Sequence, residues 1–324
     1  MTAARPTFGE LEARVITLHG EGRFDEALEV AHDAAESFPE RVAYTSFWVA
    51  CIRGVAGEPE KGMRSLMDAV DAGPAWWGPE LLREDPDLES LRSLPAFDEL
   101  VRECERRGRQ ARAEARAEWT IVEPVGEART GAGLIALHGR SGNLADSMER
   151  WRGATTAGIT VVALQSSQMV ADGMYCWDEV AIAARDVAGA SSTVFGTDEG
   201  VVLAGFSQGG GLAVYLTLSR GPVRARGFVS IAPSFGREPI TLGGISRLLP
   251  GAALAGVRGW MAIGERDDRY RPPAEEVGRA LDAAGVATRW SVFEGLGHDY
   301  PAPFEGHLSD AVSFVLDPTS SISP

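Results

Sequence analysis

Residues 201–211 read VVLAGFSQGGG and combine the pattern of a buried strand with that of a tight turn into a helix. Residues 201–204 are apolar and rich in β-branched side chains, which favours a strand inside a sheet. Gly205 and Gly209 frame Ser207 in a GxSxG pattern, in which the glycines leave room for a sharp reversal of the chain. Such a turn exposes the serine at a helix N-terminus, where the helix dipole favours developing negative charge. The stretch therefore predicts an α/β fold that presents a nucleophilic serine.

Short apolar segments recur from Trp119 onward and alternate with segments long enough for helices. We expect strands at residues 119–123, 134–137, 160–164, 201–204, 227–231, 260–263 and 290–293. This alternation is typical of a mostly parallel sheet that helices cover on both faces. Ligands of such sheets bind at the carboxyl ends of the strands. The residues that directly follow the strands are therefore the candidates for a functional site.

The first third of the chain shows helical periodicity instead. Small or apolar residues and a proline recur at an interval of 35 residues: Gly22, Ala27, Ala31, Ala34 and Pro39 match Gly57, Gly62, Leu66, Ala69 and Pro74. The spacing predicts two helical hairpins and resembles the tetratricopeptide repeat, whose unit has about 34 residues. Residues 79–107 are expected to add a divergent helical element with these residues facing inward: Leu88, Leu91, Phe97, Leu100 and Val101.

The helical region is expected to be either a cap on the following domain or a repeat array that binds a protein partner or mediates oligomerisation. Trp76 and Trp77 are expected in core or interdomain packing rather than in a ligand groove. The charged, alanine-rich run at residues 104–118 predicts an exposed helix or linker. We therefore divide the chain near residue 117 into an all-α domain of residues 1–117 and an α/β domain of residues 118–324.

Composition limits the classes of function. Hydrophobic residues make up 44% of the 324-residue chain, enough for the cores of one or two domains, and the net charge of −15 argues against nucleic acid or anionic membrane as the main partner. Cys51, Cys104 and Cys176 are widely separated, which favours free thiols over disulfides or a metal site. The sequence shows no signal-peptide pattern and no long apolar segment, so we expect a cytoplasmic protein without integral membrane association.

The segment HGRSGN at residues 138–143 directly follows an expected strand. It resembles the HGxGxN-type oxyanion loop of the α/β-hydrolase superfamily, in its carboxylesterase, phospholipase and acyl-thioesterase branch, with Ser141 where a third glycine is common. The resemblance implies that the backbone N–H groups of Arg140 or Ser141, together with that of Gln208, hold the oxyanion of a tetrahedral intermediate. It also implies that His138 braces the loop and is not the catalytic base.

Two further candidates follow later strands. In the GERDD turn, Asp267 occupies a position similar to that of the family's triad acid, and Asp268 and Glu265 are rivals that sequence spacing alone does not separate. The segment GLGHDYP holds His298, the candidate base. The order Ser207, Asp267, His298 is the order of nucleophile, acid and base in this superfamily.

The substrate pocket is the least defined part of the expected site. Met174 and Trp177 are expected either to wall an acyl or alcohol pocket or to seal the sheet, and residues 234–257 to form either a lid or an ordinary connection. The sequence thus predicts a serine hydrolase that cleaves a small-molecule carboxylic ester or thioester through an acyl-enzyme, with no metal and no cofactor. The alternatives are a peptidase or amidase on the same fold, and an inactive binding module with a partner-binding repeat domain.

Overall fold

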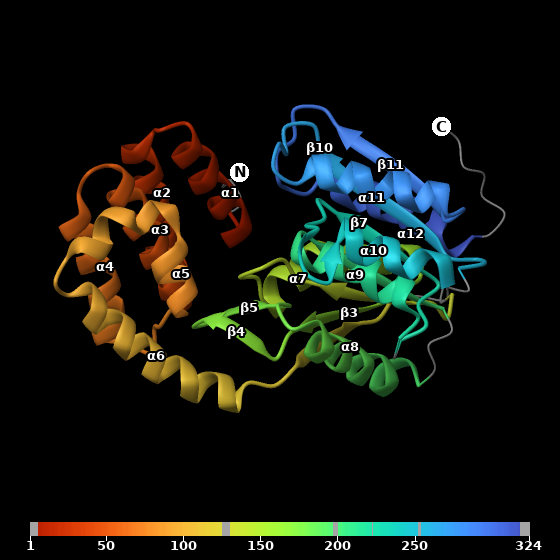
Figure 1. Ribbon diagram of the computed structural model, residues 1–324, viewed down its shortest axis with the longest axis horizontal. Coiled ribbons are helices and arrows are strands. Elements are labelled where there is room, and N and C mark those ends of the chain that lie inside the picture. Colours follow the sequence, from red (N-terminus) through yellow and green to blue (C-terminus); the bar gives the residue numbers. More distant parts are fainter. Residues whose placement is uncertain (1–5, 125–129, 197–199, 222, 252–253, 318–324) are drawn as a thin grey trace, which may run out of the picture. The chain divides into compact units, whose positions relative to one another are not determined.

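The computed structural model describes residues 6–124, 130–196, 200–221, 223–251 and 254–317. The chain divides into two compact units (Figure 1). The first consists of Met1–Ala115 and Met169–Met174, and the second of Arg116–Gln168 and Tyr175–Pro324. The chain therefore leaves the second unit once, contributes a short segment to the first, and returns.

The first unit is built from helices. Its elements are α1 (Phe8–Gly20), α2 (Phe24–Ser37), η1 (Pro39–Arg41), α3 (Val42–Val55), α4 (Pro59–Ala72), α5 (Pro79–Glu84), η2 (Pro86–Ser93) and α6 (Phe97–Glu114), of which η1 and η2 are 3-10 helices. Helix α1 begins at a capping box, in which the Thr7 hydroxyl accepts from the N–H of Glu10 and the Glu10 carboxylate accepts from the N–H of Thr7. Gly22 and Gly57 take positive φ angles of 73° and 79° in the turns of the two helix pairs, so the sequence repeat corresponds to two helical hairpins, as predicted.

The core of this unit contains residues that the helical periodicity predicted to face inward. The small residues of the repeat and the five inward positions of the divergent element are buried: Ala27, Ala31, Ala34, Leu66, Ala69, Leu88, Leu91, Phe97, Leu100 and Val101. Trp76 and Trp77 are also buried, and the indole N–H of Trp77 donates to the carbonyl of Ala43 at 3.0 Å. The pair thus belongs to the helical core and not to a ligand groove.

Helix α6 confirms the expected helix at residues 104–118 as far as Glu114, and it also buries one narrow face. The helix continues to Glu114, and Cys104 and Gly108 are buried on the same face as Leu100 and Val101. The guanidinium of Arg107 donates to the carbonyls of Val70 and Gly73. A helix with charges on most of its surface can still bury one narrow stripe, which the high charge density of the segment concealed.

A β-hairpin of the second unit supplies the extra segment of the first. Strands β4 (Gln168–Ala171) and β5 (Met174–Cys176) pair with each other. At the tip, the carbonyl of Val170 accepts from the N–H of Gly78 at 2.7 Å, and the N–H of Asp172 donates to the carbonyl of Trp76 at 2.9 Å. The tip therefore extends the hydrogen bonding of the helical unit by a short bridge.

The second unit contains a seven-stranded sheet in the order β1–β3–β2–β6–β7–β10–β11. Its strands are β1 (Glu118–Val122), β2 (Gly133–Leu137), β3 (Thr160–Gln165), β6 (Val201–Phe206), β7 (Gly227–Ile231), β10 (Arg258–Gly264) and β11 (Ala287–Phe293). Every neighbouring pair is parallel except β1 with β3. All seven expected strands are present, and the predicted mostly parallel α/β architecture is confirmed.

Helices cover both faces of this sheet (Figure 1). One face packs on α8 (Val180–Phe195), α9 (Gln208–Ser219), α10 (Leu242–Leu248) and α11 (Arg271–Ala283), and the other on α7 (Leu144–Trp151) and α12 (Phe304–Leu316). Successive residues of a strand alternate between the two cores, because side chains of a strand point to opposite faces: Ile135 and Leu137 join the first core, Leu134 and Ala136 the second.

The strand register brings the candidate loops together at one edge of the sheet. Leu137 at the end of β2 pairs with Gly205 of β6, so the loop that begins at His138 lies beside the turn at Ser207. Gly264 at the end of β10 pairs with Phe293 at the end of β11, so the loops after these two strands are also neighbours. The parallel sheet therefore assembles at its carboxyl edge the segments that the sequence singled out.

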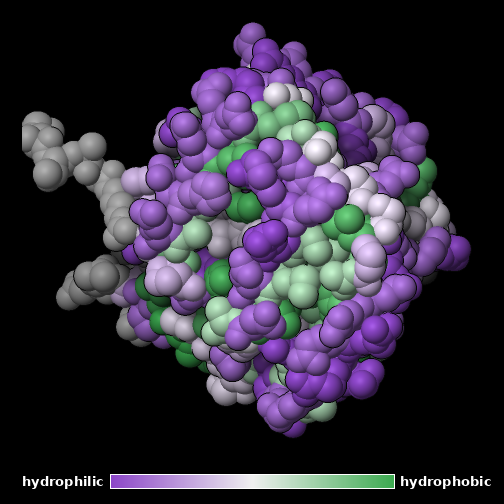
Figure 2. Space-filling model, turned by 90° about the vertical axis from the view of Figure 1, so that its left-hand side faces the viewer, coloured by the Kyte–Doolittle hydropathy of each residue, from purple (hydrophilic) through white to green (hydrophobic). Residues whose placement is uncertain are grey.

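The surface of the helical unit is largely polar. Figure 2 views the molecule from the side on which α4 lies in Figure 1, where hydrophilic side chains cover most of the face and smaller hydrophobic areas lie between them. Ile16 and Val55 are the strongly exposed large apolar residues that this unit contributes among the described residues. No helix in the described part of the chain is long and apolar enough to cross a membrane.

Candidate active site

Ser207 sits at the sharp turn between β6 and α9. Its backbone angles, φ 52° and ψ −115°, lie in a region that L-residues rarely adopt. A Cβ atom on Gly205 would clash with the backbone of Gly209, and one on Gly209 would clash with the carbonyls of Leu137 and His138. Both glycines of the GxSxG pattern are therefore needed for the turn, which lifts the serine side chain out of the sheet.

The structure brings Ser207, His298 and Asp267 together. The imidazole Nε2 of His298 lies 2.9 Å from the Ser207 Oγ, and its Nδ1 lies 2.7 Å from the Asp267 Oδ2. The carboxylate is buried, with only 4% of Asp267 exposed, and the imidazole ring lies against the rings of Phe206 and Tyr270. This arrangement allows the imidazole to accept the serine proton while the carboxylate holds its other nitrogen protonated.

The two rival carboxylates of the GERDD turn have other surroundings. Asp268 is exposed, and the carboxylate of Glu265 accepts from the N–H of Gly295 at 3.0 Å. Among the described residues, Asp267 is the carboxylate within hydrogen-bond distance of His298. Sequence spacing left the three acids open because adjacent loop residues differ only in the direction of their side chains, which the strand register does not determine.

His138 braces the loop that lies beside Ser207. Its Nε2 accepts from the N–H of Ser166 at 3.2 Å, so Nδ1 carries the proton and donates to the carbonyl of Gly139 at 2.7 Å. Burial lowers the pKa of His138 to about 4, and the ring stacks on Trp177 at 4.7 Å between centroids. The imidazole is thus neutral, and its two hydrogen bonds tie the loop after β2 to the segment after β3.

The candidate oxyanion donors flank the nucleophile. Gln208 is the first residue of α9, and the leading N–H groups of a helix have no acceptor within it. Gly139 packs against Ser207, since a Cβ atom built on it would lie 3.5 Å from the serine Cβ, and Arg140 and Ser141 follow directly in the same loop. The candidate donors thus lie on two segments that both adjoin Ser207.

The side chain of Gln208 connects the turn at Ser207 to the base of the β4–β5 hairpin. Its Oε1 accepts from the N–H of Trp177 at 2.9 Å, and its Nε2 donates to the Asp178 carboxylate at 2.7 Å. Arg140 donates to the same carboxylate. Burial alone would raise the pKa of Asp178, but the hydrogen bonds from Arg140 and Gln208 and the charge of Arg237 hold it below its usual value.

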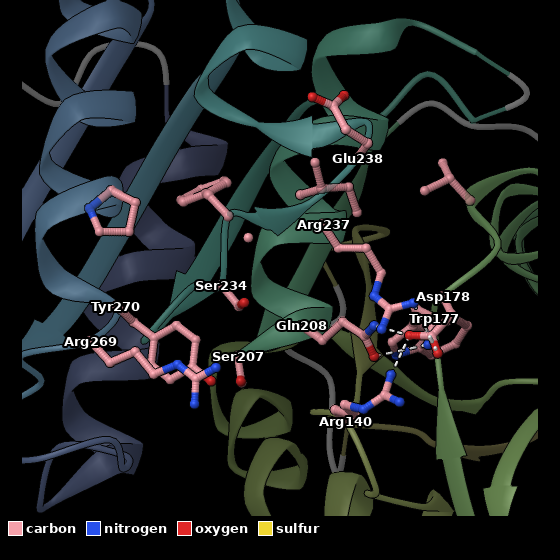
Figure 3. A pocket seen from close by; sticks show the side chains of 15 residues that line it. Arg140, Trp177, Asp178, Ser207, Gln208, Ser234, Arg237, Glu238, Arg269 and Tyr270 are labelled. Carbon is pink, nitrogen blue, oxygen red and sulfur yellow. Dashed lines mark hydrogen bonds and ion pairs between the residues drawn. The ribbon is translucent and has the colours of Figure 1, made fainter. Parts of the chain in front are cut away.

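A cavity of about 360 Å³ opens beside Ser207 (Figure 3). Trp177 lines it, as the sequence suggested, and the indole N–H also donates to the carbonyl of His138 at 2.9 Å. Met174 does not line it, which corrects that expectation: the residue is buried in β5, three positions earlier, at the end of the segment that belongs to the first unit. Residues 234–238 also line it, and residues 252–253 of the proposed lid lie outside the described residues.

Sequence reasoning missed Arg237, Arg269 and Tyr270, all of which line the cavity. The last two residues follow Asp267 on the same post-strand loop, so their position in the sequence did carry a signal. Arg237 carried no signal, since it reaches the cavity from β8 (Gly236–Arg237), a two-residue strand paired with β9 (Ile240–Thr241).

The first unit contains a cluster of side chains of metal-ligand types. Cys51, Asp85 and Asp87 place potential ligand atoms within 4.8 Å of one another. Burial raises the pKa of the Cys51 thiol and also that of Asp85. Both shifts favour the protonated forms, which do not bind metal ions, so the cluster gives no support to a metal centre.

Comparisons with known proteins find matches for this chain. Residues 7–112 match the family model described as the A/B hydrolase-like, N-terminal domain. Among curated proteins, a chloroplastic protein of Arabidopsis thaliana is 32% identical over 84 residues, which is 25% of this chain. The match covers 24% of that protein, so the chain corresponds to about a quarter of the relative's length.

Solved structures resemble the whole chain or its second unit. An uncharacterized protein from Bacillus cereus ATCC 10987 is 22% identical with a TM-score of 0.53, over 96% of this chain and 99% of that chain. Esterase PE8 is 15% identical with a TM-score of 0.52, over 62% of this chain and 100% of that chain. Acyl-protein thioesterase 2 of Zea mays is 14% identical with a TM-score of 0.52, over 62% and 99%. At these identities the likeness is one of fold, and the α/β-hydrolase fold is confirmed.

Proposed function

We propose that this protein, an α/β-hydrolase fold with an A/B hydrolase-like N-terminal domain, is a serine hydrolase that cleaves carboxylic esters or thioesters through an acyl-enzyme. The observation that carries the proposal is the unbroken chain of hydrogen bonds from the Ser207 Oγ through both nitrogens of His298 to the buried carboxylate of Asp267. A serine hydroxyl is a weak nucleophile by itself and requires such a base to become reactive near neutral pH.

In the first half of the reaction, the Ser207 Oγ attacks the carbonyl carbon while His298 Nε2 takes the hydroxyl proton. Asp267 keeps Nδ1 protonated and stabilises the positive charge that the imidazole acquires. The imidazolium then gives its proton to the leaving oxygen or sulfur, and the acyl group remains on the serine. In the second half, a water molecule takes the place of the alcohol or thiol, and the same proton transfers release the acid.

The negative charge that develops on the carbonyl oxygen would be held by backbone N–H groups. Gln208 offers one at the start of α9, where the helix dipole adds to it, and Arg140 or Ser141 offers another from the loop that His138 braces. Losing one such donor costs on the order of 10²- to 10³-fold in rate in serine hydrolases. The hydrogen bonds of Gln208 to Trp177 and Asp178 keep this end of the helix in place.

The test combines labelling with turnover. The wild type is expected to react with a fluorophosphonate probe and to hydrolyse p-nitrophenyl butyrate, and Ser207→Ala is expected to lose the label and roughly 10³-fold or more of kcat. Ser219→Ala is the matched control, because Ser219 lies at the other end of α9 and its hydroxyl donates to the carbonyl of Leu216 in the same helix. A Ser207→Ala variant that retains wild-type turnover would refute the proposal.

The same assay separates the classes of substrate. Esters, thioesters and aminoacyl amides that share one acyl group are compared by kcat/KM. We expect the ester and thioester to be hydrolysed and the amide to be hydrolysed least. A preference for the amide would indicate a peptidase or amidase on the same fold, with the same three residues in the same roles.

A further inference from the structure

The cavity beside Ser207 carries a surplus of positive charge, although the net charge of the chain is −15. Three guanidinium groups line it, from Arg140, Arg237 and Arg269, together with two carboxylates, from Asp178 and Glu238. The lining therefore holds one more positive than negative side chain. In an acidic chain this local reversal requires a reason, because it concentrates cations where the substrate must bind.

Both carboxylates of the lining are already engaged. Asp178 bonds to Arg140 and lies 3.6 Å from Arg237. Glu238 accepts from the Thr241 hydroxyl at 3.1 Å and pairs at 3.2 Å with Arg247, which is not part of the lining. Figure 3 shows the Glu238 carboxylate on the far side of the cavity from Ser207. Neither carboxylate pairs with Arg269, the third arginine of the lining.

Within the described part of the chain, the guanidinium of Arg269 has no carboxylate within ion-pair distance and no hydrogen-bond acceptor. It lies 5.3 Å from the centre of the Tyr270 ring, whose own centre is 4.3 Å from that of the His298 ring. In Figure 3, Arg269 and Tyr270 lie on one side of Ser207, and Arg140, Asp178 and Trp177 lie on the other. Among the described residues, Arg269 is thus an unpaired cation in the lining of the cavity that also contains Ser207.

The position of Arg269 follows from the same loop that supplies the triad acid. The carbonyl of Asp267 accepts from the N–H of Tyr270 at 3.2 Å and from that of Arg271 at 2.9 Å. Because Asp267 is itself held by His298, the backbone on both sides of Arg269 is fixed relative to the nucleophile. The loop that supplies Asp267 therefore also places Arg269 in the lining of the cavity beside Ser207.

We propose that the preferred substrates are esters that carry one carboxylate group close to the scissile carbonyl, and that Arg269 binds this carboxylate. The proposal rests on the proposed serine hydrolase function and adds the class of substrate to it. The planar guanidinium presents paired N–H donors that match the two oxygens of a carboxylate. A single negative charge balances the surplus of one positive side chain, whereas a phosphate monoester carries about 1.5 to 2 negative charges near neutral pH.

The test uses pairs of esters that differ in one charge. For the acyl side, mono-p-nitrophenyl adipate is compared with p-nitrophenyl hexanoate, which has an acyl chain of the same length and no carboxylate. For the alcohol side, m-acetoxybenzoate is compared with phenyl acetate. Each kcat/KM is divided by the rate constant of spontaneous alkaline hydrolysis of the same ester, so that the ratio within a pair reports recognition by the protein and not leaving-group chemistry.

We expect one of the two pairs to show a wild-type preference for the charged ester of roughly tenfold or more, the size of a charged hydrogen bond to a partly exposed group. Arg269→Gln should abolish most of this preference, Arg269→Lys should retain part of it, and added salt should weaken it in the wild type. The control is Arg266→Gln: Arg266 is exposed on the same loop and does not line the cavity, so this variant should keep the wild-type preference. The pair that responds identifies the side of the ester that carries the carboxylate.

Two results would overturn the inference and leave the hydrolase proposal standing. One is hydrolysis of charged and neutral esters with equal corrected kcat/KM in both pairs. The other is a preference that Arg269→Gln leaves intact, which would assign the selection to other groups. In contrast, a wild type that hydrolyses none of the four esters and takes no fluorophosphonate label would refute the proposed function, and the inference would fall with it.

Discussion

The neutral, buried imidazole of His138 makes the stability of the second unit depend on pH. Burial lowers its pKa from 6.5 to about 4 in the folded protein, while the unfolded chain keeps the ordinary value. Between these two values the unfolded state binds a proton that the folded state does not, so the contribution to stability is complete above about pH 6.5 and is lost as the pH falls toward about 4. The folded protein is therefore expected to lose stability as the pH falls.

The size of the effect follows from the two pKa values. The full difference of about 2.5 units corresponds to about 3 kcal/mol in the free energy of unfolding, of which about 2 kcal/mol is lost between about pH 7.5 and about pH 5. Other titrating groups also act over this range, so the quantity to measure is the difference between the wild type and a variant without the imidazole. His138→Gln is the suitable variant, because its side-chain oxygen can still accept from the N–H of Ser166.

The assay is urea unfolding followed by tryptophan fluorescence, with loss of ester hydrolysis marking the transition of the second unit. His138→Gln should be the less stable protein at about pH 7.5, because it loses the ring stacked on Trp177, and the difference should shrink by about 2 kcal/mol at about pH 5. His32→Gln removes an exposed imidazole and should leave the pH dependence as it is in the wild type. A difference between wild type and His138→Gln that stays constant across this range would refute the reasoning.

Two further substitutions test the geometry of the site. Asp267→Asn should lower kcat by roughly 10⁴-fold, since the amide favours the wrong tautomer of His298. Asp268→Asn is the control and should leave kcat close to that of the wild type. Equal losses in kcat for the two variants would contradict the assignment of the acid. Gly209→Ala should destabilise the fold by about 3 kcal/mol or more in thermal or urea unfolding, because the methyl group would clash with the carbonyls of Leu137 and His138. Gly189→Ala, in the middle of α8 with open space around it, should instead stabilise the protein by up to about 1 kcal/mol. A Gly209→Ala protein as stable as this control would show that the turn can relax.

The sheet and its functional edge could be predicted from sequence because parallel strands leave a strong local signal. Each central strand is a short apolar run, and the residue that follows it lies at the carboxyl edge whatever the details of the packing. Ser207, Asp267 and His298 each follow such a run, so their convergence required only the strand order. The predicted helical hairpins rest on an equally local signal, the 35-residue repeat of small positions.

What could not be predicted depends on side-chain direction and on contacts between distant segments. The choice of Asp267 over Asp268 is a matter of which side chain points toward the histidine ring. Asp178 holds Arg140, Arg237 and Gln208 together from three separate elements, and none of these residues carries a pattern that indicates the others. The hairpin tip in the first unit left no signal either, because its binding is through backbone atoms of residues 76–78, which any sequence supplies.

That hairpin tip imposes an order on the folding of the chain during synthesis. The helices of the first unit leave the ribosome first, yet the N–H of Gly78 bonds to the carbonyl of Val170, and the carbonyl of Trp76 accepts from the N–H of Asp172. These two hydrogen bonds can form only after residues 116–168 of the second unit have been translated, and a chain cut at residue 115 would lack them. A single cut therefore cannot separate the two units without removing the hairpin tip from the first.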